Sequence, residues 1–263
     1  MKWHAQGKRI LTVMVTGLVS WTVALSLGQC EVAGALAQTA EQERMAVHLA
    51  TLLRSGRAVI SNNQALINDE TKGDKGLTGE KVVALAKENY KKATNRELDK
   101  VDRSTVEGKL TQAMLESMKE VMDKAQPLIN KKGVEYKGFL PAVFAKQVGD
   151  AFRKKADGVA DIKLTAPKDY VRNRANAPDA WEDLAIESQF KSNGWAKGKA
   201  YTEMKEHKGK PAFRLIIPEY YVASCLECHG EPKGAEDPHG GGKKEGGKLD
   251  ELGGAISVAI YIK

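Results

Sequence analysis

Apolar residues in the first half of the chain recur at helical spacing. Between Met45 and Leu66 they follow a 4-3 repeat, which places them on one seam of a helix. Gly56 and Asn63 interrupt this seam, so we expect the helix to pack within the protein rather than to form a long coiled coil. The helix should end near Asn68. The seam consists of Met45, Leu49, Leu52, Gly56, Val59, Asn63 and Leu66.

Two more helices are predicted before the middle of the chain. One follows Thr78 and carries apolar residues from Val82 to Tyr90. The next opens at Ser104-Thr105-Val106-Glu107, which has the composition of a capping box. We expect it to stop before Pro127, because proline lacks the backbone donor that a helix interior uses.

The second half of the chain mixes helical and strand patterns. Helices are predicted from Pro141 through Phe152 and from Pro178 to about Phe190, with proline at or near the first turn in each. A turn at His207-Lys208-Gly209-Lys210 is typical of a hairpin between two strands. The strands predicted in this half are Asp161 to Thr165, Lys199 to Glu206 and Ala212 to Ile217.

The C-terminal segment ends in a strand. Residues 230–253 form a long loop rich in Gly, Lys and acidic residues, and a loop of this length is often functional. From Ile256 to Ile262 apolar residues alternate, so we expect a strand with one buried face. The fold predicted is α+β, with a helical N-terminal region, 38–138, packed on a small antiparallel domain, 139–263.

The N-terminus has the layout of a secretory signal peptide. Lys2, Lys8 and Arg9 form a basic start, an uncharged apolar run follows, and Ala35-Leu36-Ala37 is a small-x-small cleavage site. We predict a signal peptide over residues 1–37 and therefore a periplasmic or otherwise exported protein. The apolar run is also close to the length of a membrane span, which leaves an uncleaved anchor as the alternative.

Charge adds little to this picture. Without the first 37 residues the chain keeps 38 basic and 33 acidic residues, a net charge of +5 spread along the sequence. No basic block or aromatic-basic pattern indicates nucleic-acid binding. We find no nucleophile motif and no phosphate loop, so we do not expect an enzyme.

The segment Cys225-Leu226-Glu227-Cys228-His229 carries the candidate chemistry. It spells C-x-x-C-H, the signature of covalent c-type haem attachment. Cys225 and Cys228 would each bond one haem vinyl group, and His229 would be the proximal iron ligand. The alternatives are a disulfide, a zinc half-site or chance, but the sequence has no second Cys pair to complete a zinc site.

Three C-terminal blocks, taken in order, resemble the Tll0287-like (DUF3365) c-type haem domain family. Two upstream blocks resemble it as well, so the likeness covers nearly the whole chain after the signal. The C-terminal blocks are Arg172-Asn173-Arg174-Ala175-Asn176-Ala177-Pro178-Asp179-Ala180-Trp181-Glu182, Cys225-Leu226-Glu227-Cys228-His229-Gly230-Glu231-Pro232 and Gly253-Gly254-Ala255-Ile256-Ser257-Val258. The upstream blocks are Arg57-Ala58-Val59-Ile60-Ser61-Asn62-Asn63-Gln64 and Gly73-Asp74-Lys75-Gly76-Leu77-Thr78.

This resemblance implies a PAS-like antiparallel sheet with an N-terminal helical extension and one covalent haem outside the cytoplasm. Such domains are often sensing modules of signalling proteins. Arg174 stands where the family pattern has Pro and adds a cation that could meet a haem propionate, as could Arg172. The alternative for both is a solvated surface charge. Some members carry a Cys in the helix that begins at Pro141, and this chain has none there.

The sixth iron ligand stays open at the level of sequence. His48 lies beside the apolar seam, His207 lies in a hairpin turn where we expect exposure, and His239 lies in the Gly-rich loop. A methionine is a further candidate, although the Met residues of the third helix suit core packing better. Water or an open position that admits a gas is the remaining alternative.

The function predicted is a redox or gas-sensing haem domain that acts through a partner protein, because no output domain follows the final strand. The alternative is a periplasmic electron-transfer cytochrome with a redox partner. A third reading is a binding module whose two Cys residues form only a disulfide. Contact with a membrane is expected only if the N-terminal segment is not cleaved.

Overall fold

The computed structural model describes residues 19–238 and 242–262. It divides into two units, Met1–Glu41 and Gln42–Lys263. Helix α1 (Val19–Asn62) begins in the first unit and continues into the second. Lys2, Lys8 and Arg9, the expected basic start of the export signal, lie outside the described residues. Within the described part of the chain, no helix has both the length and the apolar stretch needed to cross a membrane.

The helices before the sheet match the sequence periodicity closely. Asn63 separates α1 from α2, so the predicted helix ends at Asn68 after one break. The side chain of Thr78 caps α3 by accepting a hydrogen bond from the Lys81 amide. Proline stands in the first turn of α5. After α1 the helices are α2 (Gln64–Asn68), α3 (Gly79–Thr94), α4 (Val106–Ile129) and α5 (Pro141–Lys155).

Helix α4 corrects two sequence predictions. Thr105, not Ser104, is the N-cap, and its hydroxyl accepts from the Gly108 amide. Glu107 does not complete a capping box, because its carboxylate binds Arg96 at 2.7 Å instead. The helix also continues through Pro127 to Ile129. Proline is tolerated there because it lies in the last turn, where it removes only one hydrogen bond near the helix end.

Four antiparallel strands form the sheet in the order β1-β4-β3-β2. The hairpin between β2 and β3 turns at Lys208 (φ 51°) and Gly209 (φ 77°), two positive-φ residues that match a type I′ turn. Residues on both faces of β4 are buried because helices pack on both sides of the sheet, so the expectation of one buried face was wrong. The strands are β1 (Ala160–Thr165), β2 (Tyr201–Met204), β3 (Ala212–Tyr220) and β4 (Leu252–Tyr261).

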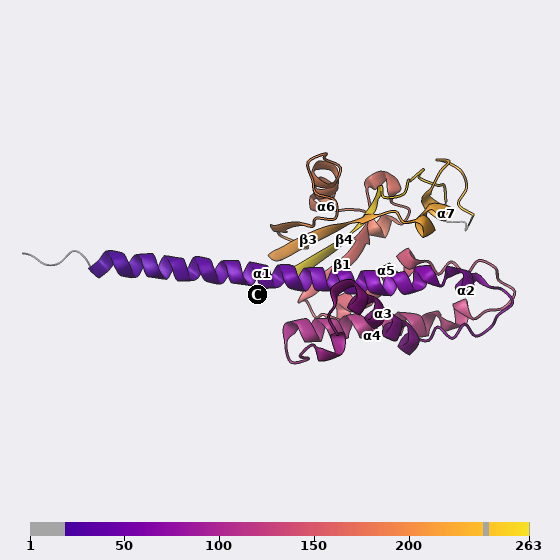
Figure 1. The fold of residues 1–263 in the computed structure, drawn as a ribbon, viewed down its shortest axis with the longest axis horizontal. Helices are drawn as coiled ribbons and strands as arrows, with labels where there is room; N and C mark the ends of the chain where they lie inside the picture. The colour runs from indigo at the N-terminus through magenta and orange to yellow at the C-terminus, as the bar shows by residue number, and fades with distance from the viewer. Residues whose placement is uncertain (1–18, 239–241, 263) are drawn as a thin grey trace, which may run out of the picture. The chain divides into compact units, whose positions relative to one another are not determined.

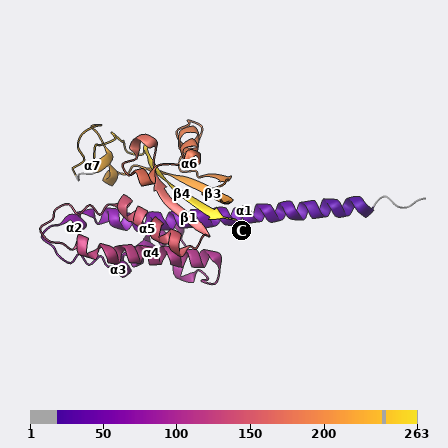
Figure 2. The ribbon, with the colours of Figure 1, turned by 180° about the vertical axis from the view of Figure 1, so that it is seen from behind.

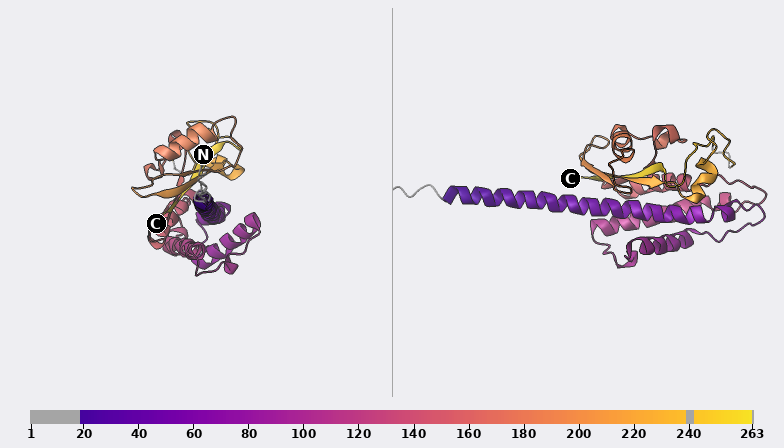
Figure 3. Two further views of the ribbon diagram at one scale, coloured as in Figure 1. Left: turned by 90° about the vertical axis from the view of Figure 1, so that its left-hand side faces the viewer. Right: turned by 45° about the horizontal axis from the view of Figure 1, so that its top comes forward.

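Helices cover both faces of the sheet. Residues of α1, α3, α4 and α5 share one hydrophobic core with Ile162, Phe213 and Val258 of the strands. The opposite face carries α6 (Ala180–Leu184) and the π-helical turn Ala185–Phe190 that continues it. Figures 1 and 2 show α6 and α5 on opposite sides of the sheet, and the end-on view in Figure 3 agrees. The α+β class predicted from the sequence is thereby confirmed.

Helix α5 approaches β1 through a glycine. A Cβ atom at Gly149 would lie 2.8 Å from the Ile162 carbonyl oxygen, which is backbone and cannot turn away. We predict that Gly149→Ala lowers the free energy of unfolding by about 1–3 kcal/mol, although alanine favours a helix by about 1 kcal/mol over glycine. Urea unfolding followed by circular dichroism measures the change.

The matched control is Gly194→Ala. Nothing lies within 4 Å of a Cβ at Gly194, so its effect should stay within about 0.5 kcal/mol. Equal unfolding midpoints for the two variants would contradict the close approach of α5 to the sheet.

Candidate haem-attachment site

The C-x-x-C-H motif forms two short helical turns directly after β3. Cys225 ends the 3-10 turn Ala223–Cys225, and α7 (Leu226–His229) holds the rest of the motif. Both thiols are free and partly exposed. Gly230 ends α7, where a Cβ would lie 2.4 Å from the Leu226 carbonyl oxygen. The turn therefore presents two thiols and one imidazole from five consecutive residues.

The imidazole of His229 is held from several directions. Its Nδ1 lies 2.7 Å from Glu245 Oε2, and its backbone oxygen accepts the Gly247 amide at 2.8 Å. The ring stacks on Tyr221, with centroids 5.5 Å apart and planes at 23°. Nε2 has no hydrogen-bond partner among the described residues. Because the Glu245 carboxylate accepts from Nδ1–H, the imidazole tautomer leaves the Nε2 lone pair for a metal.

Two glycines make room for Tyr221. A Cβ at Gly247 would lie 2.3 Å from the Tyr221 ring, and one at Gly253 would lie 2.5 Å from it. The backbone on both sides therefore contacts the ring directly. Burial is the main cause that raises the pKa of Tyr221 above its ordinary value. The phenol remains neutral and acts as a packing surface for His229.

Arg172 ties the motif to the long loop before β4. Its Nε and Nη2 atoms donate to the two oxygens of Glu245 at 2.6 and 3.0 Å. Nη1 donates to Asp237 at 2.5 Å, and Nη2 also donates to the Cys228 carbonyl oxygen at 2.7 Å. The side chains of Asp237 and Glu245 are 0% and 7% exposed. Arg172 is therefore neither a solvated surface charge nor free to pair with another carboxylate.

Arg174 has a different position. It is exposed and begins the 3-10 turn Arg174–Asn176. The Asn173 side chain caps this turn by accepting the Ala175 amide at 3.0 Å. The turn therefore forms here with Arg174 at its first position.

Burial and ion pairs set the ionisation of the groups around the motif. Burial alone would raise the pKa of Glu245, but hydrogen bonds from His229 and Arg172 outweigh it and lower the pKa to about 2. Burial, reinforced by the nearby Asp237 carboxylate, raises the pKa of the Cys228 thiol to about 12. Burial also raises the pKa of Tyr136, with further contributions from Asp237 and Cys228. Tyr136 comes from the loop between α4 and α5, so the helical half also borders the motif.

His48 is bound inside the helical core, not at the haem motif. Its side chain bonds Tyr90 Oη through Nδ1 at 2.6 Å and Thr111 Oγ1 through Nε2 at 2.8 Å. The residue is 3% exposed, and burial lowers its pKa to about 4. Both ring nitrogens are occupied, so His48 has no lone pair to offer to iron.

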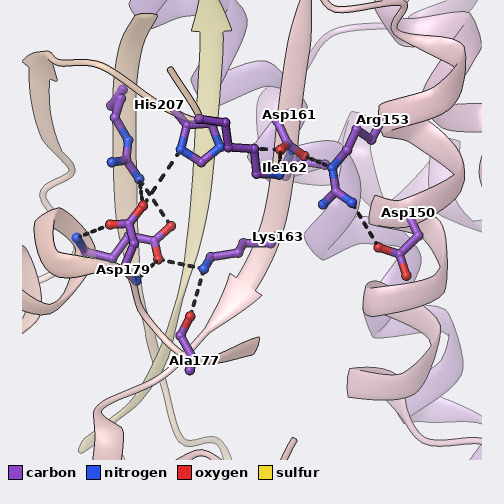
Figure 4. A network of polar contacts seen from close by, with 11 residues as sticks. Asp150, Arg153, Asp161, Ile162, Lys163, Ala177, Asp179 and His207 are labelled. Atoms are coloured by element: carbon purple, nitrogen blue, oxygen red, sulfur yellow. Dashed lines mark hydrogen bonds and ion pairs between the residues drawn. The ribbon is translucent and has the colours of Figure 1, made fainter. Parts of the chain in front are cut away.

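His207 is largely buried, contrary to the exposure expected from its hairpin turn. Its side chain is 11% exposed and stacks on Tyr261. Nε2 lies 3.3 Å from Asp161 Oδ2, and Nδ1 lies 3.7 Å from Asp179 Oδ2. Figure 4 shows it between these two carboxylates, in a polar cluster on the α6 side of the sheet. The turn is buried because it folds back onto β1 and the start of α6, which no local pattern reveals.

The remaining candidates for the sixth iron ligand are the methionines of α4 and His239. The methionines Met114, Met118 and Met122 of α4 are fully buried in the core, as their packing role predicts. His239 lies outside the described residues. Among the described residues, no cluster of three or more His, Cys, Asp or Glu side chains has the arrangement of a metal site.

A groove lies elsewhere on the molecule. It has a volume of about 720 Å³ and is lined by α3, α4 and the short turn at Leu98, with charged side chains at its rim. None of its lining residues belongs to the C-x-x-C-H motif or to the Arg172 cluster. The chemistry of the motif therefore does not depend on this groove.

A family model described as Tll0287-like matches residues 41–260, so the chain belongs to the Tll0287-like family. The match covers the helices, the sheet and the C-x-x-C-H motif, and it indicates a haem-binding domain. No curated protein and no solved structure matched the chain.

Sequence reasoning missed the residues that surround His229. Glu245 and Asp237 lie in the loop among many other charges, and nothing in their spacing sets them apart. Tyr221 is the second of two adjacent tyrosines shortly before the motif. This closeness in sequence was the available hint that an aromatic ring packs on His229. Arg172 was singled out, but for a contact with haem rather than for its role within the protein.

We predict that in His48→Gln the free energy of unfolding falls less between pH 7 and pH 4.5 than in the wild type. The haem spectrum should not change. The folded-state pKa of about 4 lies below the unfolded value of 6.5, so neutral His48 stabilises the protein above pH 6.5 and this contribution is lost as the pH falls toward 4. At about 1.4 kcal/mol per pKa unit, the contribution is of order 3 kcal/mol.

Glutamine can hydrogen-bond but does not titrate in this range. Urea unfolding at pH 7 and pH 4.5 should therefore show a smaller loss for the variant than for the wild type. Equal losses, or an altered Soret spectrum in the variant, would contradict this account of His48.

Proposed function

We propose that the protein is an exported haem protein with one c-type haem, held by Cys225 and Cys228 and ligated by His229. The observation that carries the proposal is the Glu245–His229 hydrogen bond of 2.7 Å, directly beside two free thiols on the same turn. This bond leaves Nε2 of His229 as the nitrogen able to bind iron. The donor set, two thiols and one imidazole in C-x-x-C-H order, is the set that c-type haem requires.

The cysteines supply the covalent chemistry. Each S–H adds across one vinyl C=C bond, so Sγ bonds one carbon and the hydrogen passes to the other, with no change in oxidation state. Once bound, the haem supplies a one-electron redox couple and an iron site for small ligands.

We propose further that this haem domain senses redox state or a small gas and signals through a partner protein, rather than acting as an enzyme. Among the candidates that the structure describes, the contacts of His48 and His207 with other side chains and the burial of the α4 methionines argue against iron ligation, which supports a sixth position that a small ligand can occupy. The resemblance to the Tll0287-like family, whose domains are often sensing modules, supports signalling through a partner protein. The signal-like N-terminus supports a periplasmic location.

Covalent attachment is tested on the protein exported from cells that mature c-type cytochromes. A denaturing gel stained for haem peroxidase activity should show haem on the chain, and a pyridine haemochrome spectrum should report two thioethers. The Cys225→Ala/Cys228→Ala variant should migrate without haem. Loss of haem from the wild-type chain on denaturation, or a spectrum of a single thioether, would overturn the proposal.

The sensing function is tested on the same preparation by the ferrous spectrum with and without carbon monoxide. An open sixth position predicts a ligand-bound Soret band at low carbon monoxide concentration. A six-coordinate ferrous spectrum that carbon monoxide leaves unchanged would favour an electron-transfer cytochrome and contradict gas sensing.

A further inference from the structure

The histidine of the motif has a charged acceptor rather than a neutral one. Glu245 Oε2 lies 2.7 Å from His229 Nδ1, and the Glu245 side chain is only 7% exposed. A backbone carbonyl would fix the same ring orientation with a partial charge alone. A buried carboxylate places a full negative charge on the nitrogen opposite the iron-binding one, with little water to screen it.

We propose that Glu245 is a positioning residue that sets the reduction potential of the haem iron through His229. This inference rests on the proposed function, because it requires His229 to be the proximal ligand. A carboxylate that accepts from Nδ1–H gives the imidazole imidazolate character and makes Nε2 a stronger donor. A stronger anionic donor stabilises ferric over ferrous iron, so Glu245 lowers the potential.

Arg172 holds the Glu245 carboxylate in position beside His229. It binds both oxygens of Glu245, which holds the carboxylate ionised and fixes the oxygen that faces His229. It also binds the Cys228 carbonyl, one residue before the ligand, so the carboxylate and the imidazole are positioned by one guanidinium. The Arg172 cation also attracts the negative charge of Glu245 and so weakens its action on His229. The size of the shift in reduction potential therefore depends on the balance between these two interactions of Glu245.

The alternative is that Glu245 is purely structural and only anchors the loop before β4. The two roles differ in what they predict for a neutral substitute. A structural anchor changes the stability of the protein when altered, whereas a donor to the ligand changes the potential. The Fe–His bond strength also reports the second role and is insensitive to the first.

The experiment compares Glu245→Gln with a matched control, Glu219→Gln, in the full-length haem-loaded protein. Glu219 is also a mostly buried carboxylate held by arginines, with Arg54 Nε and Arg57 Nη1 each 2.7 Å away. It lies on β3 shortly before the motif and binds these arginines rather than His229. Each variant removes one negative charge. Only Glu245→Gln removes a charge that is hydrogen-bonded to His229.

Spectroelectrochemical titration should show that Glu245→Gln raises the reduction potential by about 59 mV or more, equivalent to about a tenfold change in the ferrous-to-ferric ratio at a fixed solution potential. The control should shift by much less. Resonance Raman spectra of the ferrous protein should show a lower Fe–His stretching frequency in Glu245→Gln alone. An unchanged potential, or equal shifts in the two variants, would overturn the inference.

The failure of this inference is distinguishable from failure of the proposed function. A wild-type chain that carries no covalent haem removes the proposed function. A wild-type chain and a Glu245→Gln variant that both carry covalent haem, at the same potential, remove only the role of Glu245. Circular dichroism and urea midpoints of both variants identify a change in folding.

Discussion

One guanidinium group holds the region around the C-x-x-C-H motif together. Arg172 donates to the carboxylates of Asp237 and Glu245 and to the carbonyl oxygen of Cys228. Both carboxylates are almost fully buried, and two buried anions without a cation would cost several kcal/mol each. Because Arg172 precedes these partners by 56 to 73 positions, the interaction joins three segments that no local structure connects.

The long loop before β4 depends on this interaction. Between Gly230 and Glu251 the described residues contain no helix or strand of the kind that holds the rest of the domain. Short backbone contacts, such as the Lys244 amide to the Ala235 oxygen at 2.8 Å, fold the loop on itself. Arg172 then fixes it against the motif. The sheet provides the base, since Tyr221 and Gly253 bracket the loop where β3 ends and β4 begins.

The orientation of His229 follows from this arrangement of protein groups. Glu245 binds Nδ1, Gly247 binds the backbone oxygen and Tyr221 packs on the ring. All three contacts come from segments that the Arg172 cluster and the sheet edge position. If His229 binds iron as proposed, its imidazole loses little side-chain freedom on binding, because its ring is already held in place.

Sequence patterns predicted those parts of the molecule that depend on local periodicity. The helix with the Met45–Leu66 seam, the helix that follows Thr78 and the hairpin turn at Lys208–Gly209 all follow from short-range preferences. Gly56 fits its place as a seam interruption, because a Cβ there would lie 2.9 Å from Met118 of α4.

The errors arose where tertiary contacts decide. Strand β4 is buried on both faces because helices far away in the sequence pack on both sides of the sheet, and alternation within the strand does not reveal those layers. His207 is buried by β1 and the start of α6. The ion pairs of Arg172 span too much sequence to leave a spacing signal, so the motif was predictable from its five residues but its surroundings were not.

Hydrogen exchange of the loop amides tests the central role of Arg172 most directly. Lysine keeps the charge at position 172 but cannot reproduce the forked geometry that binds both Glu245 oxygens. In Arg172→Lys the amides of Gly247 and Lys244 should exchange much faster than in the wild type, while that of Val258 in β4 stays protected. Equal protection of the loop amides in the two proteins would contradict the account.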